Sequence, residues 1–264
     1  MRTFAIVLRQ YYLIRGSLSR VIPLFAWVVI DVVLWGFLTR YLNAISASPI
    51  DFVRVLLGAA LLWDFFTRVM QGVTMAFFED VWSRNFLNMF ASPITLREYV
   101  SGLVLSSIMT SLIGLVMMLV VAGAVFGLSL ASYGAVIALF LLVLFVFGIA
   151  MGIVGSAIVL RLGPAAEWFV WPIPAVVSPF AGVFYPVSTL PVWMQYVSRL
   201  LPPSYVFDGL RAIATGRPWS AMSLLWGGGL AVVDLLVACW VFGAVYRYAV
   251  RTGLIARYSA ESVT

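Results

Sequence analysis

The sequence contains no histidine and no lysine, and all sixteen of its basic residues are arginine. Without histidine the chain cannot form a Ser-His-Asp triad, a Cys-His pair or an HExxH zinc helix. Without lysine it cannot form the GxxxxGK[ST] phosphate loop of a standard ATP site. Its one cysteine, Cys239, cannot form an intrachain disulfide. We therefore expect no catalytic residue, no metal site and no cofactor bound by this chain.

Charge of either sign is also scarce. Only 10% of the 264 residues are charged, while 64% are hydrophobic and 15% are aromatic. A soluble domain carries roughly 25% charged residues. This composition excludes a soluble protein and is typical of a chain that is embedded in a membrane.

Six apolar stretches have about the length of a membrane-spanning helix, which needs roughly 20 mainly apolar residues. They cover residues 21–39, 53–78, 103–126, 134–160, 169–187 and 222–246. We see no domain linker and no internal repeat. The sequence therefore predicts an all-α membrane protein with six transmembrane helices in one domain, residues 1–264.

The arginines predict the orientation, because short cytoplasmic loops collect basic residues. With the N-terminus inside, ten of the sixteen arginines fall on the cytoplasmic side and four on the outer side. The cytoplasmic ones are Arg2, Arg9, Arg15, Arg20, Arg84, Arg97, Arg161, Arg247, Arg251 and Arg257. We expect both termini in the cytoplasm and a multi-pass location in a bacterial-type inner membrane.

Residues 1–20 precede the first predicted span. On a helix, Arg2 and Arg9 fall near one face and Phe4 and Leu8 on another. Such a helix would lie along the inner membrane surface with its arginines among anionic headgroups. A short soluble overhang is the alternative.

The region 79–102, between spans two and three, mixes charges with large apolar residues. On a helix, Trp82 and Phe86 lie on the same side. Such a segment suits the docking of a partner protein. A helix that rests on lipid headgroups would have the same pattern, and the two interpretations stay open.

Ionisable residues inside spans are costly, so they are candidates for function. Trp27, Asp31 and Trp35 are each four residues apart and project from one helix face, and Trp63 and Asp64 repeat the pairing in span two. These residues, with Tyr185, could line a polar, aromatic pathway between spans one, two and five.

A structural interpretation of the same residues is also open, and it is favoured for Asp64 and Arg68. Arg68 follows Asp64 at i+4, where an intrahelical ion pair would lower the cost of burying both. The tryptophans would then belong to helix packing or to the interfacial belt. Asp234 is the buried acid of span six.

Prolines interrupt span five, and pairs of glycines favour close packing of other spans. Span five contains Pro172, Pro174, Pro179 and Pro186, which are too many for an uninterrupted helix. The proline-rich and apolar stretch 188–221 predicts short interfacial or re-entrant helices on the outer side. The small-xxx-small pairs 123/127 and 148/152 predict close helix contacts.

Two segments together resemble a known family. The first reads FAGVFYPVSTLPVW over 180–193 and continues as LPPSY over 201–205 and GLR over 209–211. The second runs from EDVW at 79 through Ser92-Pro93 to EYVSG at 98–102. With the six-span layout, these segments make the chain similar to the ABC type-2 exporter permeases over nearly its whole length.

The resemblance implies a transport subunit without catalysis of its own. Two copies of the chain would bind two copies of a cytoplasmic ATP-binding-cassette ATPase, which would bind ATP and Mg, and no nucleic acid is expected. The residues implied in coupling to the ATPase are Glu79, Asp80, Trp82, Arg84, Asn85 and Phe86. The residues implied in the outer re-entrant motif are Gly182, Tyr185, Pro186, Pro191, Trp193, Pro203, Tyr205 and Arg211.

The substrate stays open at this level. Similar permeases export polysaccharides, wall polymers, lipids, drugs or nodulation-type signals, so an amphipathic, lipid-like or polymeric substrate is expected. The alternative function is a proton-coupled secondary transporter that uses Asp31, Asp64 and Asp234 as a relay.

Overall fold

A computed structural model describes residues 2–16, 18–46, 51–82 and 94–254 of the chain. These residues form helices and connecting turns, with no strand among them. Arg84, Asn85 and Phe86 lie outside the described residues, so their predicted place in a coupling helix stays a prediction.

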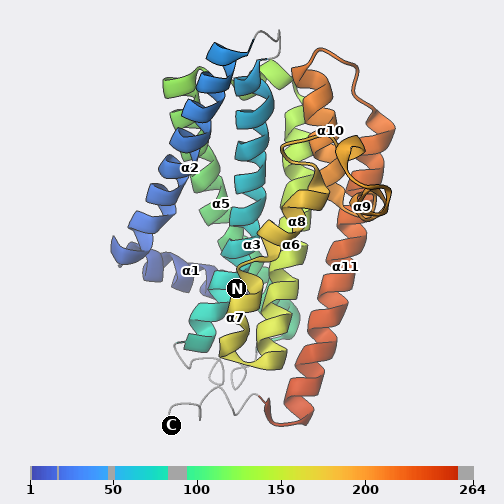
Figure 1. Cartoon of the computed structure of the whole chain (residues 1–264). Coiled ribbons are helices and arrows are strands. Elements are labelled where there is room, and N and C mark those ends of the chain that lie inside the picture. Colours follow the sequence, from blue (N-terminus) through green and yellow to red (C-terminus); the bar gives the residue numbers. More distant parts are fainter. Residues whose placement is uncertain (1, 17, 47–50, 83–93, 255–264) are drawn as a thin grey trace.

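Long upright helices form the body of the molecule (Figure 1). Helix α2 spans Leu18–Ile45, and the π-helix η1 (Val53–Leu57) continues directly into α3 (Gly58–Trp82). The other three are α5 (Leu96–Phe126), α6 (Val136–Leu162) and α11 (Ala221–Arg251). The short helix α1 (Arg2–Arg15) crosses the lower part of this bundle and packs against α5.

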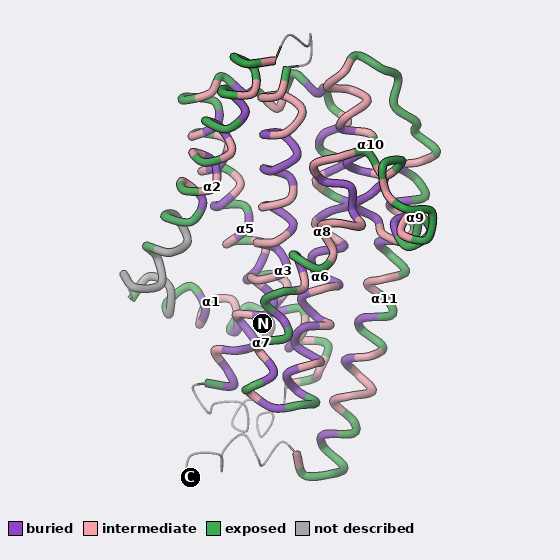
Figure 2. Tube along the Cα trace, in the orientation of Figure 1, coloured by how far each residue is buried: buried purple, intermediate pink, exposed green. Residues whose placement is uncertain are grey.

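Helix α3 is the centre of the bundle, with α5 and α6 packed against it. Its residues Phe66, Val69, Met70 and Phe77 are fully buried, and Figure 2 shows buried positions along much of α3. On α6, Gly148 and Gly152 allow this close approach, since a Cβ at Gly152 would lie 2.7 Å from the carbonyl oxygen of Met70. The packing predicted for the 148/152 pair is therefore confirmed. The prediction for 123/127 is wrong at Gly127, which instead caps the end of α5 in the left-handed conformation.

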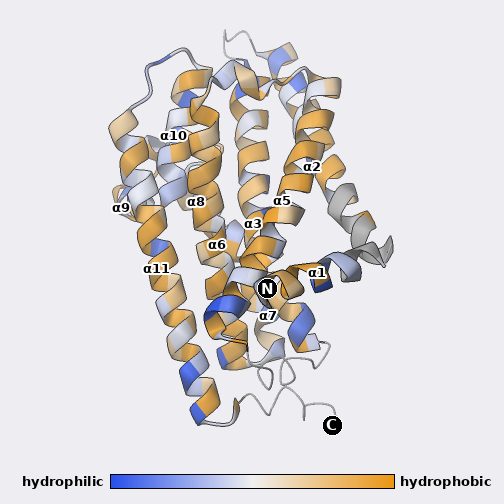
Figure 3. Ribbon diagram, turned by 180° about the vertical axis from the view of Figure 1, so that it is seen from behind, coloured by the Kyte–Doolittle hydropathy of each residue, from blue (hydrophilic) through white to orange (hydrophobic). Residues whose placement is uncertain are grey.

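The outer faces of the long helices carry large exposed apolar side chains. Val116 is 60% exposed on α5, and Leu236 and Trp240 of α11 are 65% and 69% exposed. Figure 3 shows hydrophobic residues over most of the length of these helices. An apolar surface this extensive suits lipid rather than water.

Four helices are long and apolar enough to cross a membrane, judged by length and composition among the described residues. They are Ala26–Ile45, Leu96–Phe126, Val136–Leu162 and Ala221–Arg251. Each coincides with a predicted span. Helix α3 has a similar length, but it carries Asp64, Arg68, Glu79 and Asp80.

The predicted fifth span, 169–187, is not one helix. After η3 (Pro164–Ala166), the chain forms the four-residue α7 (Glu167–Val170) and then α8 (Ile173–Ala181). Pro172 and Pro174 lie where α8 begins, and Gly182 ends it with φ at +63°. The break expected from the prolines is thus confirmed. Helix α8 ends at Ala181, whereas the predicted span runs to residue 187.

The short elements η4 (Val187–Thr189), α9 (Val192–Ser198) and α10 (Pro202–Ala214) follow before the chain enters α11. They lie beside the upper half of α6 and α11 in Figure 1. Helix α10 packs against α6, α8 and α11. Helical segments predicted within 188–221 are therefore present.

Candidate functional site

The lower end of α3 holds a buried polar contact that fixes α1. Asp80 is fully buried, and its carboxylate forms an ion pair with Arg9 of α1. The hydroxyl of Tyr99, in the first turn of α5, donates a hydrogen bond of 2.8 Å to Asp80 Oδ2. We call Arg9, Asp80 and Tyr99 the Asp80 cluster. It joins three helices through one carboxylate.

Further contacts hold α1 in the same place. The side-chain amide of Gln10 donates to the carbonyl of Ala76, and the Oγ atoms of Thr3 and Ser101 are 3.5 Å apart. Ile6 packs against Gly102, where a Cβ would lie 2.8 Å from Ile6 Cγ2. Helix α1 is therefore fastened to α3 and α5 rather than extending away from the bundle as an overhang.

The capping of α5 sets the position of Tyr99. The Thr95 hydroxyl accepts from the backbone N–H of Glu98, and the Glu98 carboxylate accepts from the N–H of Thr95. This capping box starts the helix at Leu96, before the predicted start at 103. The Thr-x-x-Glu spacing was a usable signal for the earlier start. No sequence signal paired Arg9 or Tyr99 with Asp80.

The other residues predicted for coupling differ in exposure. Asp80 is enclosed and cannot itself contact a partner protein, whereas Trp82 at the end of α3 is 51% exposed. Glu79 is half-buried. Among the described coupling residues, Trp82 is the one with a large exposed apolar surface.

Two acids of the predicted pathway lie near one arginine. Arg68 Nε donates to Asp64 Oδ2 over 2.8 Å, so the predicted intrahelical ion pair is confirmed. Asp31 of α2 interacts electrostatically with the same guanidinium. The stem of Arg68 lies against Gly114 of α5. We call Asp31, Asp64 and Arg68 the Arg68 cluster.

The aromatic residues of the predicted pathway are divided. Trp35 stacks on Phe184, with ring centroids 4.4 Å apart, and Trp63 contacts Phe66 and Phe207. Trp27, in contrast, is 62% exposed. The structure thus brings Trp35 to the segment that follows α8 and Trp63 to α10, and it leaves Trp27 on the surface of the chain.

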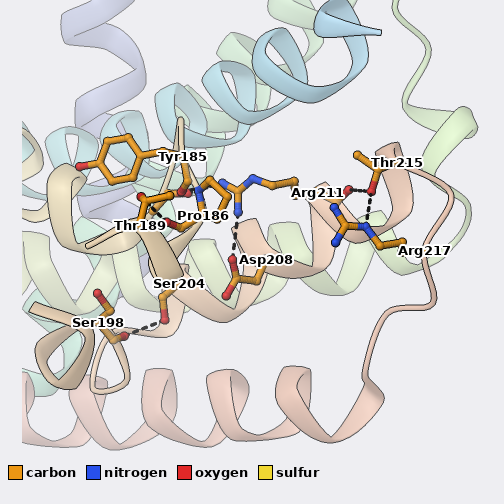
Figure 4. A network of polar contacts seen from close by, with 10 residues as sticks. Tyr185, Pro186, Thr189, Ser198, Ser204, Asp208, Arg211, Thr215 and Arg217 are labelled. Atoms are coloured by element: carbon orange, nitrogen blue, oxygen red, sulfur yellow. Dashed lines mark hydrogen bonds and ion pairs between the residues drawn. The ribbon is translucent and has the colours of Figure 1, made fainter. Parts of the chain in front are cut away.

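The predicted outer motif folds around Arg211 of α10. Its Nη2 donates to the carbonyls of Gly182 at 2.6 Å and Tyr185 at 3.0 Å, and its Nη1 donates to Asp208 at 2.9 Å. Figure 4 shows this guanidinium between the turn that follows α8 and helix α10. We call these four residues the Arg211 network. Asp208 is a member that the sequence did not indicate.

Other motif residues stabilise the same region through backbone carbonyls. The Tyr185 hydroxyl donates to Pro179 at 2.9 Å, and the Tyr205 hydroxyl donates to Arg199 at 2.8 Å. Pro186 accepts from the Thr189 hydroxyl at 2.7 Å, and Trp193 contacts the ring of Phe180. Pro203 is buried in the first turn of α10, and Pro191 precedes α9. The motif residues therefore build one structured unit.

The chain is a multi-pass membrane protein. Its helices form a bundle in which the N-terminal helix α1 lies crosswise and the fifth predicted span is broken. Residues 3–214 match the family model of the ABC-2 type transporters. The chain belongs to this family, whose members are membrane subunits of transporters that work with an ATP-binding-cassette ATPase.

A local similarity to one curated protein accompanies the family match. Over 66 residues, the chain is 35% identical to Nodulation protein J of Rhizobium meliloti (strain 1021). This match covers 24% of the present chain and 25% of the relative, so it spans about a quarter of the length of either protein.

Proposed function

We propose that this chain is the membrane subunit of an ATP-driven exporter, with ATP hydrolysed by a separate cytoplasmic subunit. Its substrate would be an amphipathic, lipid-like or polymeric molecule that leaves the cytoplasm. Two copies of the chain would pair and bind two copies of the ATPase. The chain would cross a bacterial-type inner membrane six times, with α3 and the segment α7 to α10 as the two less regular passes and with both termini inside.

The observation that carries this proposal is the Asp80 cluster. In sequence, residues 83–93 connect α3 to α5, and α1 is bonded to both of these helices, through the ion pair of Arg9 with Asp80 and the contact of Thr3 with Ser101. A force applied to residues 83–93 by a moving partner would therefore reach three helices together. Such rigid linkage suits a subunit that receives its energy from outside the chain.

The opposite end of the bundle supports a role in guiding substrate. The stacked rings of Trp35 and Phe184 connect α2 to the turn that Arg211 holds. Irregular backbone at membrane depth is tolerated where it is buried in protein or lines a cavity. The segment from α8 to α10 would cap the pathway, and the Arg68 cluster would supply polar groups below it.

Copurification tests the proposal. The tagged full chain, purified in mild detergent from its native host, should retain an ATP-binding-cassette ATPase and release phosphate from ATP. Trp82→Ala should reduce ATPase retention several-fold while the chain still inserts. Trp226→Ala, which removes an indole that is 64% exposed near the start of α11, is the matched control and should change nothing. If Trp82→Ala retains the ATPase as well as wild type does, the ATPase does not dock at the end of α3 that carries Trp82.

A proton-coupled transporter is the second candidate, because Asp64 is ion-paired with Arg68 and Asp31 is within electrostatic range of both residues. The proposed relay is less well supported at Asp234, since α11 packs against α6 and α10. Transport that continues after ATP depletion, under a maintained proton gradient, would favour this candidate over the exporter.

A further inference from the structure

An open cleft of about 660 Å³ lies at the end of the bundle far from α1. The end of α2, the start of η1, the end of α5 and η2 (Leu130–Tyr133) form its walls. Its charged lining residues are Arg40, Asp51 and Arg54. The cleft takes no part in the Asp80 cluster, the Arg68 cluster or the Arg211 network.

The acid in the cleft is already engaged by the protein. Asp51 Oδ1 accepts hydrogen bonds from the Asn43 side chain at 3.1 Å and from the backbone N–H of Val53 at 3.0 Å. Asn43 also accepts from the backbone N–H of Phe52 at 2.8 Å. These bonds fix the start of η1 and hold the carboxylate against backbone donors.

The two arginines retain most of their hydrogen-bonding capacity. In the described part of the chain, the Arg54 guanidinium donates to one acceptor, the Ser132 carbonyl at 3.1 Å, although it carries five N–H donors. Its Nε is buried and has no hydrogen-bond partner there. For Arg40, which is exposed, the described residues provide no hydrogen-bond acceptor and no ion-pair partner. The cleft thus presents two guanidinium groups for one engaged carboxylate.

The position of Arg54 is fixed by its neighbours. The Tyr133 hydroxyl donates to the Arg54 carbonyl, and the guanidinium carbon lies 6.0 Å from the centroid of the Tyr133 ring. The Tyr133 hydroxyl is protonated at neutral pH and can donate, and burial raises its pKa further. A guanidinium held in place in this way loses less freedom when it binds an anion.

Part of the lining is apolar, at Ala44, Val53, Phe126 and Leu128, and the uncharged residues Asn43, Gly127, Ser129 and Ser132 complete it. The apolar helices α2 and α5 end beside it, at Ile45 and Phe126, which is the depth at which lipid headgroups lie. We propose that this cleft binds the anionic phosphate headgroup of a membrane amphiphile, with Arg40 and Arg54 contacting the phosphate and the apolar lining contacting the start of the acyl chains.

Lipid binding to the full chain, without ATPase or nucleotide, tests this site separately from the exporter function. Native mass spectrometry would measure binding of phosphatidylglycerol and of zwitterionic phosphatidylcholine. Arg40→Gln and Arg54→Gln should each weaken phosphatidylglycerol binding about tenfold, the factor expected for one lost charge-assisted hydrogen bond. Phosphatidylcholine should bind more weakly to wild type and respond less to either substitution.

Arg217→Gln is the matched control, because Arg217 is an exposed arginine between α10 and α11 that does not line the cleft. It should leave phosphatidylglycerol binding unchanged. If Arg54→Gln fails to fold, Arg40→Gln still decides the question, since the Arg40 side chain is exposed and has no hydrogen-bond or ion-pair partner among the described residues. Equal lipid affinities for Arg40→Gln, Arg217→Gln and wild type would overturn the proposal.

Competition distinguishes a headgroup site from a simple anion site. Short-chain dihexanoyl phosphatidylglycerol should displace the bound lipid at least tenfold more effectively than inorganic phosphate, because only the lipid also contacts the apolar lining. Equal displacement by inorganic phosphate would show that the cleft takes free anions and would overturn the assignment to an amphiphile.

Discussion

Trp35 of α2 stacks on Phe184, with ring centroids 4.4 Å apart and planes inclined by 12°. In sequence, Phe184 lies between Gly182 and Tyr185, whose carbonyls accept hydrogen bonds from Arg211. The guanidinium of α10 therefore holds the turn that presents Phe184 to α2. One side chain of the outer motif thereby sets the contact between the first long helix and the broken fifth segment.

A double-mutant cycle on this stack should reveal a specific interaction. Trp35→Ala and Phe184→Ala should each destabilise the protein, and their coupling energy should be about 0.5–1.5 kcal/mol, as for other aromatic pairs. Reversible unfolding of the purified chain in mixed micelles would measure it. Trp27→Ala, at a residue that is 62% exposed, should change stability little and show no coupling to Phe184→Ala. Strict additivity of the Trp35 and Phe184 substitutions would contradict the prediction.

Arg211→Lys should be strongly disruptive although it keeps the charge. A lysine ammonium cannot reproduce the fork that serves Gly182, Tyr185 and Asp208 together. Loss of one or two charge-assisted hydrogen bonds should lower the free energy of unfolding by about 2–4 kcal/mol. Arg217→Lys is the control, because Arg217 donates from Nε to the Thr215 hydroxyl on the surface. Equal midpoints of unfolding for the two variants would show that the fork is unimportant.

Several features of the fold were predictable because they depend on local sequence. The positions of α2, α5, α6 and α11 follow from runs of apolar residues, although α2 and α5 are longer than the predicted spans, and the break within span five follows from closely spaced prolines. The ion pair between Asp64 and Arg68 follows from i, i+4 spacing. The motif around Arg211 was recognised from the sequence. Its geometry was not, because Arg211 bonds the carbonyls of Tyr185 and Gly182, which lie 26 and 29 residues before it.

The Asp80 cluster illustrates what sequence alone did not provide. Arg9 and Asp80 are 71 residues apart, and their pairing depends on how α1 crosses the bundle. Periodicity placed Arg9 on the polar face of a surface helix, where lipid headgroups were the expected partners. The structure instead pairs it with a buried acid on α3, a contact that only the packed fold creates.

Gly152→Ala should destabilise the bundle at its centre. A Cβ there would lie 2.7 Å from the Met70 carbonyl oxygen and 2.7 Å from Val73 Cβ, so α3 and α6 must separate. Overpacking of this kind costs about 1–3 kcal/mol. Gly243→Ala on α11 is the matched control, since a Cβ there meets no atom within 4 Å. The midpoint of unfolding should fall for Gly152→Ala and should not fall for Gly243→Ala.

The Asp80 cluster should control how firmly α1 is attached to α5. In a Cys239→Ser background, a Thr3→Cys and Ser101→Cys pair reports this attachment, because the native Oγ atoms are only 3.5 Å apart and mild oxidation can join the sulfurs. Asp80→Asn removes the charge that binds Arg9, so the cross-linking rate should fall about tenfold, as expected when a closed state loses ~1.4 kcal/mol.

Tyr99→Phe should have a smaller effect, because the ion pair with Arg9 remains. Arg97→Gln, an exposed change in the same turn of α5, serves as the control. An unchanged rate in Asp80→Asn would mean that apolar contacts such as Ile6 against Gly102 hold α1 without the ion pair.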